Sequence, residues 1–137
     1  TKVCSLFIDS ANAQRVITGA DIVIDALDNI SSRFIVETAC KDLKIPFIHG
    51  AINNMFGQVS TIFPEDKGLK SIYGQFEKYN KNNIENRLSV PSFTPAFVAS
   101  IQVAEALKIL LNKGNTLRNR LLLINLETMD LNILEME

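Results

Sequence analysis

The chain has 137 residues, a size typical of one domain, so we treat residues 1–137 as a single domain. Its hydrophobic fraction of 47% is enough for a buried core and excludes a disordered or low-complexity chain. The net charge of -1 does not indicate a nucleic-acid partner, and no apolar run approaches the roughly 20 residues of a membrane span. We therefore expect neither nucleic acid nor a membrane as a partner.

The two cysteines, Cys4 and Cys40, are too few for a disulfide framework, and neither belongs to a CxxC pair that would indicate zinc. Each lies among apolar residues, so we expect small buried thiols in a reducing cytoplasm and no structural zinc. The sequence starts at Thr1 without an initiator methionine, which we interpret as processing or as a cut from a longer protein.

Short apolar runs define the strands of the first half. Lys2–Ile8 is predicted to be a strand, followed by a helical turn that ends near Gly19. The β-branched run Asp21–Leu27 does not alternate, which is typical of a strand buried on both faces of a parallel sheet. Pro46–Ile52 is predicted to be the following strand.

A helix is predicted to begin at Ser31 or Ser32, between these last two strands. Arg33, Glu37 and Lys41 alternate in sign at four-residue spacing, so we expect an exposed ladder of ion pairs. The opposite, apolar side of the helix faces the sheet, through Ile35, Val36, Ala39, Cys40 and Leu43. Strand, helix and strand in this order predict a βαβ unit with a right-handed crossover.

The second half opens with a predicted strand at Gln58–Phe63 and a polar crossover over about residues 65–92, with room for a helical turn. A long helix is predicted over Phe93–Lys113, capped by Thr94 and buried except for a narrow stripe. Residues 121–136 are predicted to form an antiparallel hairpin. The fold class is therefore α/β, with parallel strands first and an antiparallel hairpin last, in the order of half a doubly wound sheet.

The best candidate for chemistry is the segment 25–29, with Asp25, Asp28 and Asn29 at the predicted end of a strand and before a helix. Ligands of open α/β sheets bind at the carboxyl ends of the strands. A carboxylate there can bind Mg²⁺, and a helix N-terminus favours phosphate oxygens. Alternatively, Asp28 or Asn29 only caps the helix, and the spacing favours neither hypothesis. His49, the only histidine, is expected to be packed and hydrogen-bonded rather than a base.

The run ADIVIDALDNISSRF and the residues that follow it closely resemble the ThiF/MoeB/HesA family of ubiquitin-like-protein-activating enzymes. That family shows an apolar strand ending in D-x-x-DN, an Arg four residues after the Asn, and several later short motifs. The helix TPAFVASIQVAEALKILLNKG and the closing hairpin also look like those of the family, so the resemblance spans essentially the whole chain. The matching positions are Asp25, Asp28, Asn29, Arg33, Ala39-Cys40, Pro46, Gly50-Ala51 and Gly57-Gln58.

The resemblance implies the C-terminal half of a Rossmann-like, doubly wound fold and part of an ATP-dependent adenylyltransferase. Such an enzyme uses Mg-ATP to adenylate the C-terminal glycine of a ubiquitin-like sulfur-carrier protein or peptide. Asp28 matches the family's magnesium-binding aspartate, and Asp25, Asp28 and Asn29 are the expected nucleotide-binding residues. Arg33 matches a further family position, as a catalytic residue or as a brace of the loop through Asp28 or Glu37.

Several features of the family have no counterpart here. No glycine-rich loop exists in residues 1–137, so ATP binding by this chain alone is expected to be weak or absent and the chain alone inactive. Leu69-Lys70-Ser71-Ile72 takes the place of the family's zinc-binding CxxC, and Arg87-Leu88-Ser89 that of the catalytic cysteine of some members. We expect no zinc and an activity that stops at adenylation.

Two other hypotheses stay open. One is a non-catalytic protein-binding or dimerisation module of the same fold, which the missing CxxC and cysteine favour. The other is half of a generic NAD-binding Rossmann domain, which leaves Asn29 and Arg33 unexplained. If upstream strands are absent, the sheet keeps an exposed edge, so we expect a homo-oligomer.

Overall fold

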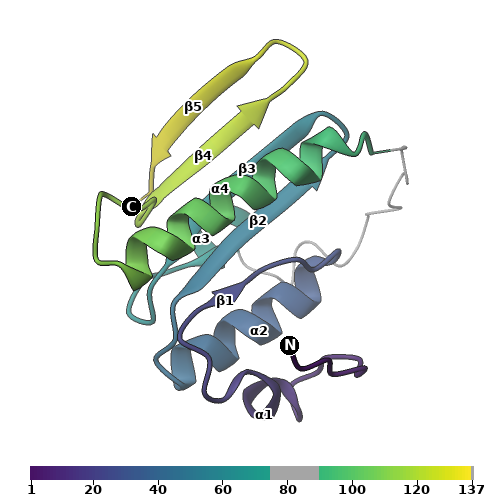
Figure 1. Ribbon diagram of the computed structural model, residues 1–137, viewed down its shortest axis with the longest axis vertical. Coiled ribbons are helices and arrows are strands. Elements are labelled where there is room, and N and C mark those ends of the chain that lie inside the picture. Colours follow the sequence, from purple (N-terminus) through teal and green to yellow (C-terminus); the bar gives the residue numbers. More distant parts are fainter. Residues whose placement is uncertain (75–89, 137) are drawn as a thin grey trace.

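Figure 1 shows a computed structural model of the chain, which describes residues 1–74 and 90–136. Within these residues one mixed sheet has five strands in the order β1-β2-β3-β4-β5. Its strands β1 and β2 run parallel, and each later pair of neighbours is antiparallel. The α/β class is therefore confirmed. The strands are β1 (Val23–Ile24), β2 (Phe47–Asn53), β3 (Phe56–Ile62), β4 (Arg120–Asn125) and β5 (Asp130–Glu135).

Helices cover both faces of this sheet. Since successive residues of a strand point to opposite sides, one strand contributes side chains to two cores. Phe47 of β2 joins one core, with residues of α1 and α2, whereas Ile48 joins a second core beneath α4. In Figure 1, α4 accordingly crosses the near side of the sheet. The helices are α1 (Ala13–Ile17), α2 (Ile30–Asp42), α3 (Leu69–Tyr73) and α4 (Phe93–Leu110).

The predicted βαβ unit is present as β1-α2-β2, but the strand after it does not continue the parallel arrangement. β2 and β3 form a hairpin in which Asn53 pairs with Phe56. A two-residue connection joins only antiparallel strands, and Asn54 has the left-handed φ of 54° that such a turn requires. The parallel part of the sheet is therefore limited to β1 and β2.

The N-terminal predictions are wrong in two places. Lys2–Ile8 forms no strand, and Val3 and Phe7 are 85% and 84% exposed. A strand needs a neighbour to pair its backbone groups, and the described sheet offers this run none. Cys4 is accordingly exposed, whereas Cys40 is buried as predicted. The predicted strand at Asp21–Leu27 shortens to β1, whose Ile24 is 42% exposed rather than buried on both faces.

The exposed ion-pair ladder predicted for α2 is also wrong, because Arg33 and Glu37 are buried. The segment around α3 folds back over this side of the helix. There the Glu37 carboxylate accepts a hydrogen bond from the backbone N–H of Leu69 at 2.9 Å and pairs with Lys41 at 3.1 Å. Gly68, with φ 70°, leaves the room that this carboxylate occupies.

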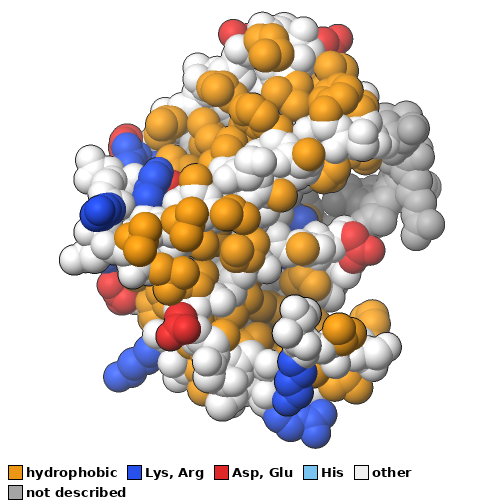
Figure 2. All heavy atoms as spheres, in the orientation of Figure 1, with side chains coloured by type: hydrophobic (Ala, Val, Ile, Leu, Met, Phe, Trp, Pro, Cys, Tyr) orange, Lys and Arg blue, Asp and Glu red, His pale blue; other side chains and the backbone are white. Residues whose placement is uncertain are grey.

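Helix α4 is less buried than predicted, and the side that faces the sheet is partly polar. Its buried positions include Gln102 and Glu105 beside Val98 and Ala106, whereas several large apolar side chains face solvent. Thr94 is not the cap: Ser92 holds that position, and Thr94 lies buried in the first turn with no hydrogen-bond partner for its hydroxyl. Figure 2 shows hydrophobic side chains gathered over this helix. The exposed apolar residues of α4 and the position after it are Phe93, Phe97, Val103, Leu107, Leu110 and Leu111.

By length and composition, α4 is the one helix in the described part of the chain that could cross a membrane, with a mean hydropathy of 1.3. Helices that pack on a sheet can have the same composition, and α4 contacts β1, β2 and β3. The expectation that a membrane is not a partner stays a prediction.

Glu105 joins α4 to the far end of β3 through a fully hydrogen-bonded carboxylate. Its Oε2 accepts from the Thr61 hydroxyl and from the backbone N–H of Leu117, both at 2.6 Å. Its Oε1 pairs with Lys108 at 2.5 Å. Such complete pairing is what makes a buried carboxylate tolerable.

We expect Glu105→Leu to lower the free energy of unfolding by about 2–4 kcal/mol, because it leaves a buried hydroxyl and a backbone N–H without acceptors. Lys108→Gln is the matched control, since the Lys108 side chain is 37% exposed and its loss should cost less than about 1 kcal/mol. Urea denaturation of both variants measures the difference. Equal effects would show that the ion pair, and not the buried acceptor, stabilises this junction.

Candidate functional site

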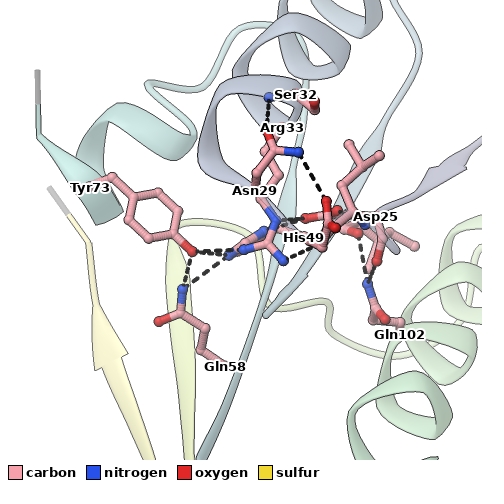
Figure 3. Close-up of polar contacts among 11 residues, drawn as sticks. Asp25, Asn29, Ser32, Arg33, His49, Gln58, Tyr73 and Gln102 are labelled. Carbon is pink, nitrogen blue, oxygen red and sulfur yellow. Dashed lines mark hydrogen bonds and ion pairs between the residues drawn. The ribbon is translucent and has the colours of Figure 1, made fainter. Parts of the chain in front are cut away.

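The candidate site lies where β1 ends beside β2 and α2 begins. Asp25, His49 and Gln58 all point to the α2 side of the sheet, as the alternation along the strands requires. Arg33 reaches the same place from α2, and Tyr73 reaches it from α3 (Figure 3). The Asp25 network consists of these five side chains: Asp25, Arg33, His49, Gln58 and Tyr73.

The carboxylate of Asp25 is fully engaged inside the protein. The residue is 3% exposed, and its Oδ2 lies 2.8 Å from His49 Nδ1 and 3.2 Å from Arg33 Nε. The Arg33 contact is an ion pair that lacks hydrogen-bond alignment, whereas Oδ1 accepts from the backbone N–H of Leu27 at 2.9 Å. Asp25 is therefore committed to contacts within the chain. We propose that it shapes the loop and that Asp28 binds the nucleotide.

Arg33 braces the loop, but through other partners than expected. Besides Asp25, its guanidinium donates to the backbone carbonyl of Leu27 and to the Tyr73 hydroxyl, the latter at 3.3 Å. Neither Asp28 nor Glu37 is among these contacts. With 8% of the residue exposed, Arg33 lies behind the loop instead of facing solvent. This position suits a positioning residue better than one that touches a substrate.

His49 is completely buried and hydrogen-bonded at both ring nitrogens, which confirms that it is packed. Burial lowers the pKa of His49, against a smaller opposing effect of the Asp25 carboxylate. A neutral ring fits the contacts: Nδ1 donates to Asp25, and Nε2, 3.1 Å from the Tyr73 oxygen, accepts its hydroxyl proton. The Tyr73 oxygen then accepts from Gln58 at 2.6 Å, and burial raises the pKa of Tyr73.

Of the two candidates for the cap of α2, the structure assigns that position to Asn29 and leaves Asp28 exposed. Asn29 is the N-cap of α2, with its Oδ1 accepting from the backbone N–H of Ser32 at 2.8 Å. Asp28 is exposed, and within the described residues its carboxylate accepts a hydrogen bond of 3.0 Å from the Asn29 amide. Its carboxylate is thus free to bind a ligand beside the N-terminus of a 13-residue helix.

An exposed carboxylate beside a helix N-terminus fits Mg²⁺ bound together with phosphates. Magnesium keeps several waters and is usually held by one or two carboxylates plus the phosphates of its substrate. The residues that the structure describes contain no group of three or more His, Cys, Asp or Glu side chains suited to a metal ion. A site built on Asp28 would therefore depend on the nucleotide for its other ligands.

Tyr73 and Gln102 were not assigned to this region from the sequence, and Gln58 appeared there only among the positions that match the family. Gln102 is a polar residue in a largely apolar predicted helix, and its position falls in the narrow stripe that was expected to stay unburied. Tyr73 carried no signal, because only the path of the chain after β3 brings α3 over the site. The positions that replace the family's CxxC form part of α3, and those that replace its cysteine, 87–89, lie outside the described residues.

Comparison with known proteins identifies the family. The ThiF family matches residues 1–137. The chain belongs to the ThiF family. It is 32% identical to the SAMP-activating enzyme E1 of Haloferax volcanii over 115 residues, which cover 84% of this chain and 43% of that protein. It is also 32% identical to the molybdopterin-synthase adenylyltransferase of Haemophilus influenzae, covering 86% of this chain and 49% of that protein.

Solved structures agree on the fold of this ThiF-family chain. The structure of Escherichia coli MccB with succinimide superposes with a TM-score of 0.74 at 19% identity, over 97% of this chain and 41% of that one. MccB with ATP superposes with a TM-score of 0.69 at 18% identity, over 93% and 40%. The neighbours are Rossmann-type enzymes, and this chain spans less than half of their length and of the two relatives above.

The pKa of His49 predicts how stability depends on pH. Because burial lowers this pKa below 6.5, the unfolded chain binds a proton more readily than the folded protein. The contribution of neutral His49 to the free energy of unfolding is therefore fully present above about pH 6.5. It decreases as the pH drops toward the folded-state pKa of His49, by at most about 1.4 kcal/mol per pH unit.

Urea denaturation at several pH values between about 7.5 and 5.5 measures this slope. His49→Asn is the control, because its amide can still donate to Asp25 but does not titrate. We expect the variant to be less stable and its stability to change little over this range, as the chain has no other histidine. A slope as steep as that of the unmodified protein would assign the effect to other groups.

Proposed function

We propose that this chain is the C-terminal part of an ATP-dependent adenylyltransferase that activates the C-terminal glycine of a ubiquitin-like sulfur-carrier protein or peptide. Membership of the ThiF family and the names of the relatives, which include adenylyltransferases and an activating enzyme, support the proposal. The observation on which the proposal depends is that the two aspartates of the D-x-x-DN motif have different surroundings. Asp25 is used internally, whereas Asp28 is free at the N-terminus of α2.

In the proposed reaction, a carboxylate oxygen of the terminal glycine attacks the α-phosphorus of ATP, and pyrophosphate leaves. Asp28 would hold Mg²⁺, which neutralises charge on the phosphates, and the free N–H groups at the start of α2 would favour a phosphate oxygen. Asn29 fixes the start of α2, and Arg33 fixes the loop from behind. A glycine-rich loop from a longer protein would supply the rest of the nucleotide site.

A second candidate is a protein-binding or dimerisation module of the same fold. The exposed apolar residues of α4 favour it, because a contiguous apolar surface of this kind usually marks an interface. The two candidates differ in a single measurable property, which is Mg-ATP binding by a chain that includes the upstream segment.

We expect a chain extended upstream to bind Mg-ATP in calorimetry and Asp28→Ala to weaken that binding about 10- to 100-fold, as the loss of an interaction with a charged group implies. Asp21→Ala is the matched control, since Asp21 is exposed but precedes β1 and so lies at its opposite end. Thermal melting should show that both variants are folded, because both positions are exposed. Absence of binding by the extended chain would favour the protein-binding module.

We also propose that this chain forms a homo-oligomer through the apolar face of α4. Light scattering at micromolar concentration should give a mass above that of the monomer. The double substitution Val103→Lys and Leu107→Lys should lower that mass, because both side chains are 50% exposed and a charge there opposes burial. Thr38→Lys, at an exposed position of α2, is the control. A monomer for the unmodified chain would contradict the proposal.

A further inference from the structure

Gln102 is a long polar side chain of α4 that reaches the end of β1 and the neighbouring part of β2. Its Nε2 donates to the backbone carbonyl of Asp25 at 2.8 Å and to that of Ile48 at 3.1 Å (Figure 3). The residue is 4% exposed. Because Asp25 follows β1 and Ile48 belongs to β2, a single amide joins both parallel strands to the helix on the other face of the sheet.

Gly50 leaves the space that this amide fills. A Cβ at position 50 would lie 2.4 Å from both Cδ and Nε2 of Gln102. Gly50 is not among the residues with positive φ, so no unusual backbone conformation accounts for a glycine here. The missing side chain at position 50 and the amide at position 102 therefore form one matched pair across two distant parts of the chain.

The two carbonyls depend on Gln102 to different degrees. The carbonyl of Ile48 also accepts from the backbone N–H of Asp25 at 2.9 Å, as part of the strand pairing. For the Asp25 carbonyl, Gln102 is the donor found among the described residues. Loss of the amide would therefore leave Ile48 paired and leave the Asp25 carbonyl buried without a donor.

That carbonyl is the first point of the loop that carries Asp28. Residues 25–29 lie between β1 and α2 and belong to neither, so side chains must fix their path. Gln102 holds the Asp25 carbonyl from the α4 side, and Arg33 holds the Leu27 carbonyl from the α2 side. Asn29 fixes the far end as the cap of α2. Among the polar side chains of this loop, Asp28 is the exposed one and is free to bind.

We propose that Gln102 is a positioning residue for Asp28, which it serves by anchoring the start of the loop 25–29 to α4. Its role toward the nucleotide rests on the function proposed above, whereas its role in fixing the loop does not. It touches neither Asp28 nor the space where a ligand of Asp28 would lie, so it acts through the backbone. It also makes the site dependent on α4.

The first test uses this chain and amide hydrogen exchange measured by NMR. Gln102→Met keeps the length and bulk of the side chain but removes the donor. We expect exchange at Leu27, whose N–H donates to Asp25 Oδ1, to become about five- to tenfold faster, with exchange in β3 and β4 unchanged. Ser100→Ala, at an exposed position of the same helix, is the matched control and should change none of these rates. Unchanged exchange in the loop would overturn the proposal.

A second variant covers the case in which Gln102→Met destabilises the whole domain. Gly50→Ala displaces the amide without altering Gln102 itself, because the new Cβ would meet the end of that flexible side chain. It should reproduce the faster exchange of the loop. Exchange that rises equally throughout the sheet in both variants would assign Gln102 a general structural role and overturn the proposal.

The third measurement separates the positioning role from the proposed function. In the extended chain we expect Gln102→Met to weaken Mg-ATP binding about fivefold when Asp28 is present and less than about twofold when Asp28→Ala is present, since coupled residues are not additive. If the effects of Gln102→Met and Asp28→Ala on Mg-ATP binding were additive, the proposal that Gln102 acts through Asp28 would be overturned. If the extended chain does not bind Mg-ATP but the loop still exchanges faster, the proposed function fails and the anchoring of the loop stands.

Discussion

The buried carboxylate of Asp25 is the group around which the site is assembled. A carboxylate out of contact with water is costly unless it is paired and hydrogen-bonded. Here Arg33 supplies the opposite charge, and the His49 ring and the backbone N–H of Leu27 each donate a hydrogen bond. Because these partners come from α2, β2 and the loop itself, one charged group joins three parts of the chain. The position of the loop 25–29 thus follows from the need to satisfy this carboxylate.

The alternation of side chains along β2 then distributes the polar and apolar contacts. Phe47 and His49 face α2, where Phe47 joins an apolar core and His49 joins the Asp25 network beside the end of β1. Ile48 and Gly50 face α4, where a second core gives way to the amide of Gln102. The two polar clusters lie on opposite faces of the sheet at the end of β1. Asp25 belongs to both, since its carboxylate meets one and its carbonyl the other.

This arrangement explains in structural terms why the D-x-x-DN motif of the ThiF family has a polar residue at each of these three positions. Its three polar residues are not interchangeable: Asp25 shapes the loop from within, Asn29 caps α2, and Asp28 remains exposed between them. A ligand-binding carboxylate on a short irregular loop needs such support if it is to be held in one place. The pairing of Gly50 with Gln102 supplies part of that support from α4, which lies far away in the sequence.

The sequence by itself determined the βαβ unit, the C-terminal hairpin, the packed histidine and the place of the motif between a strand and a helix. These features depend on local periodicity and capping, which neighbouring residues specify. It did not determine the antiparallel course of β3, the burial of Arg33 and Glu37 or the outward apolar face of α4. Charge spacing shows which residues share a side of a helix, but not what covers that side. Here the burial of these side chains depends on α3, which folds back over α2, and on buried carboxylates that pair with residues distant in the sequence. Both are properties of the tertiary structure alone.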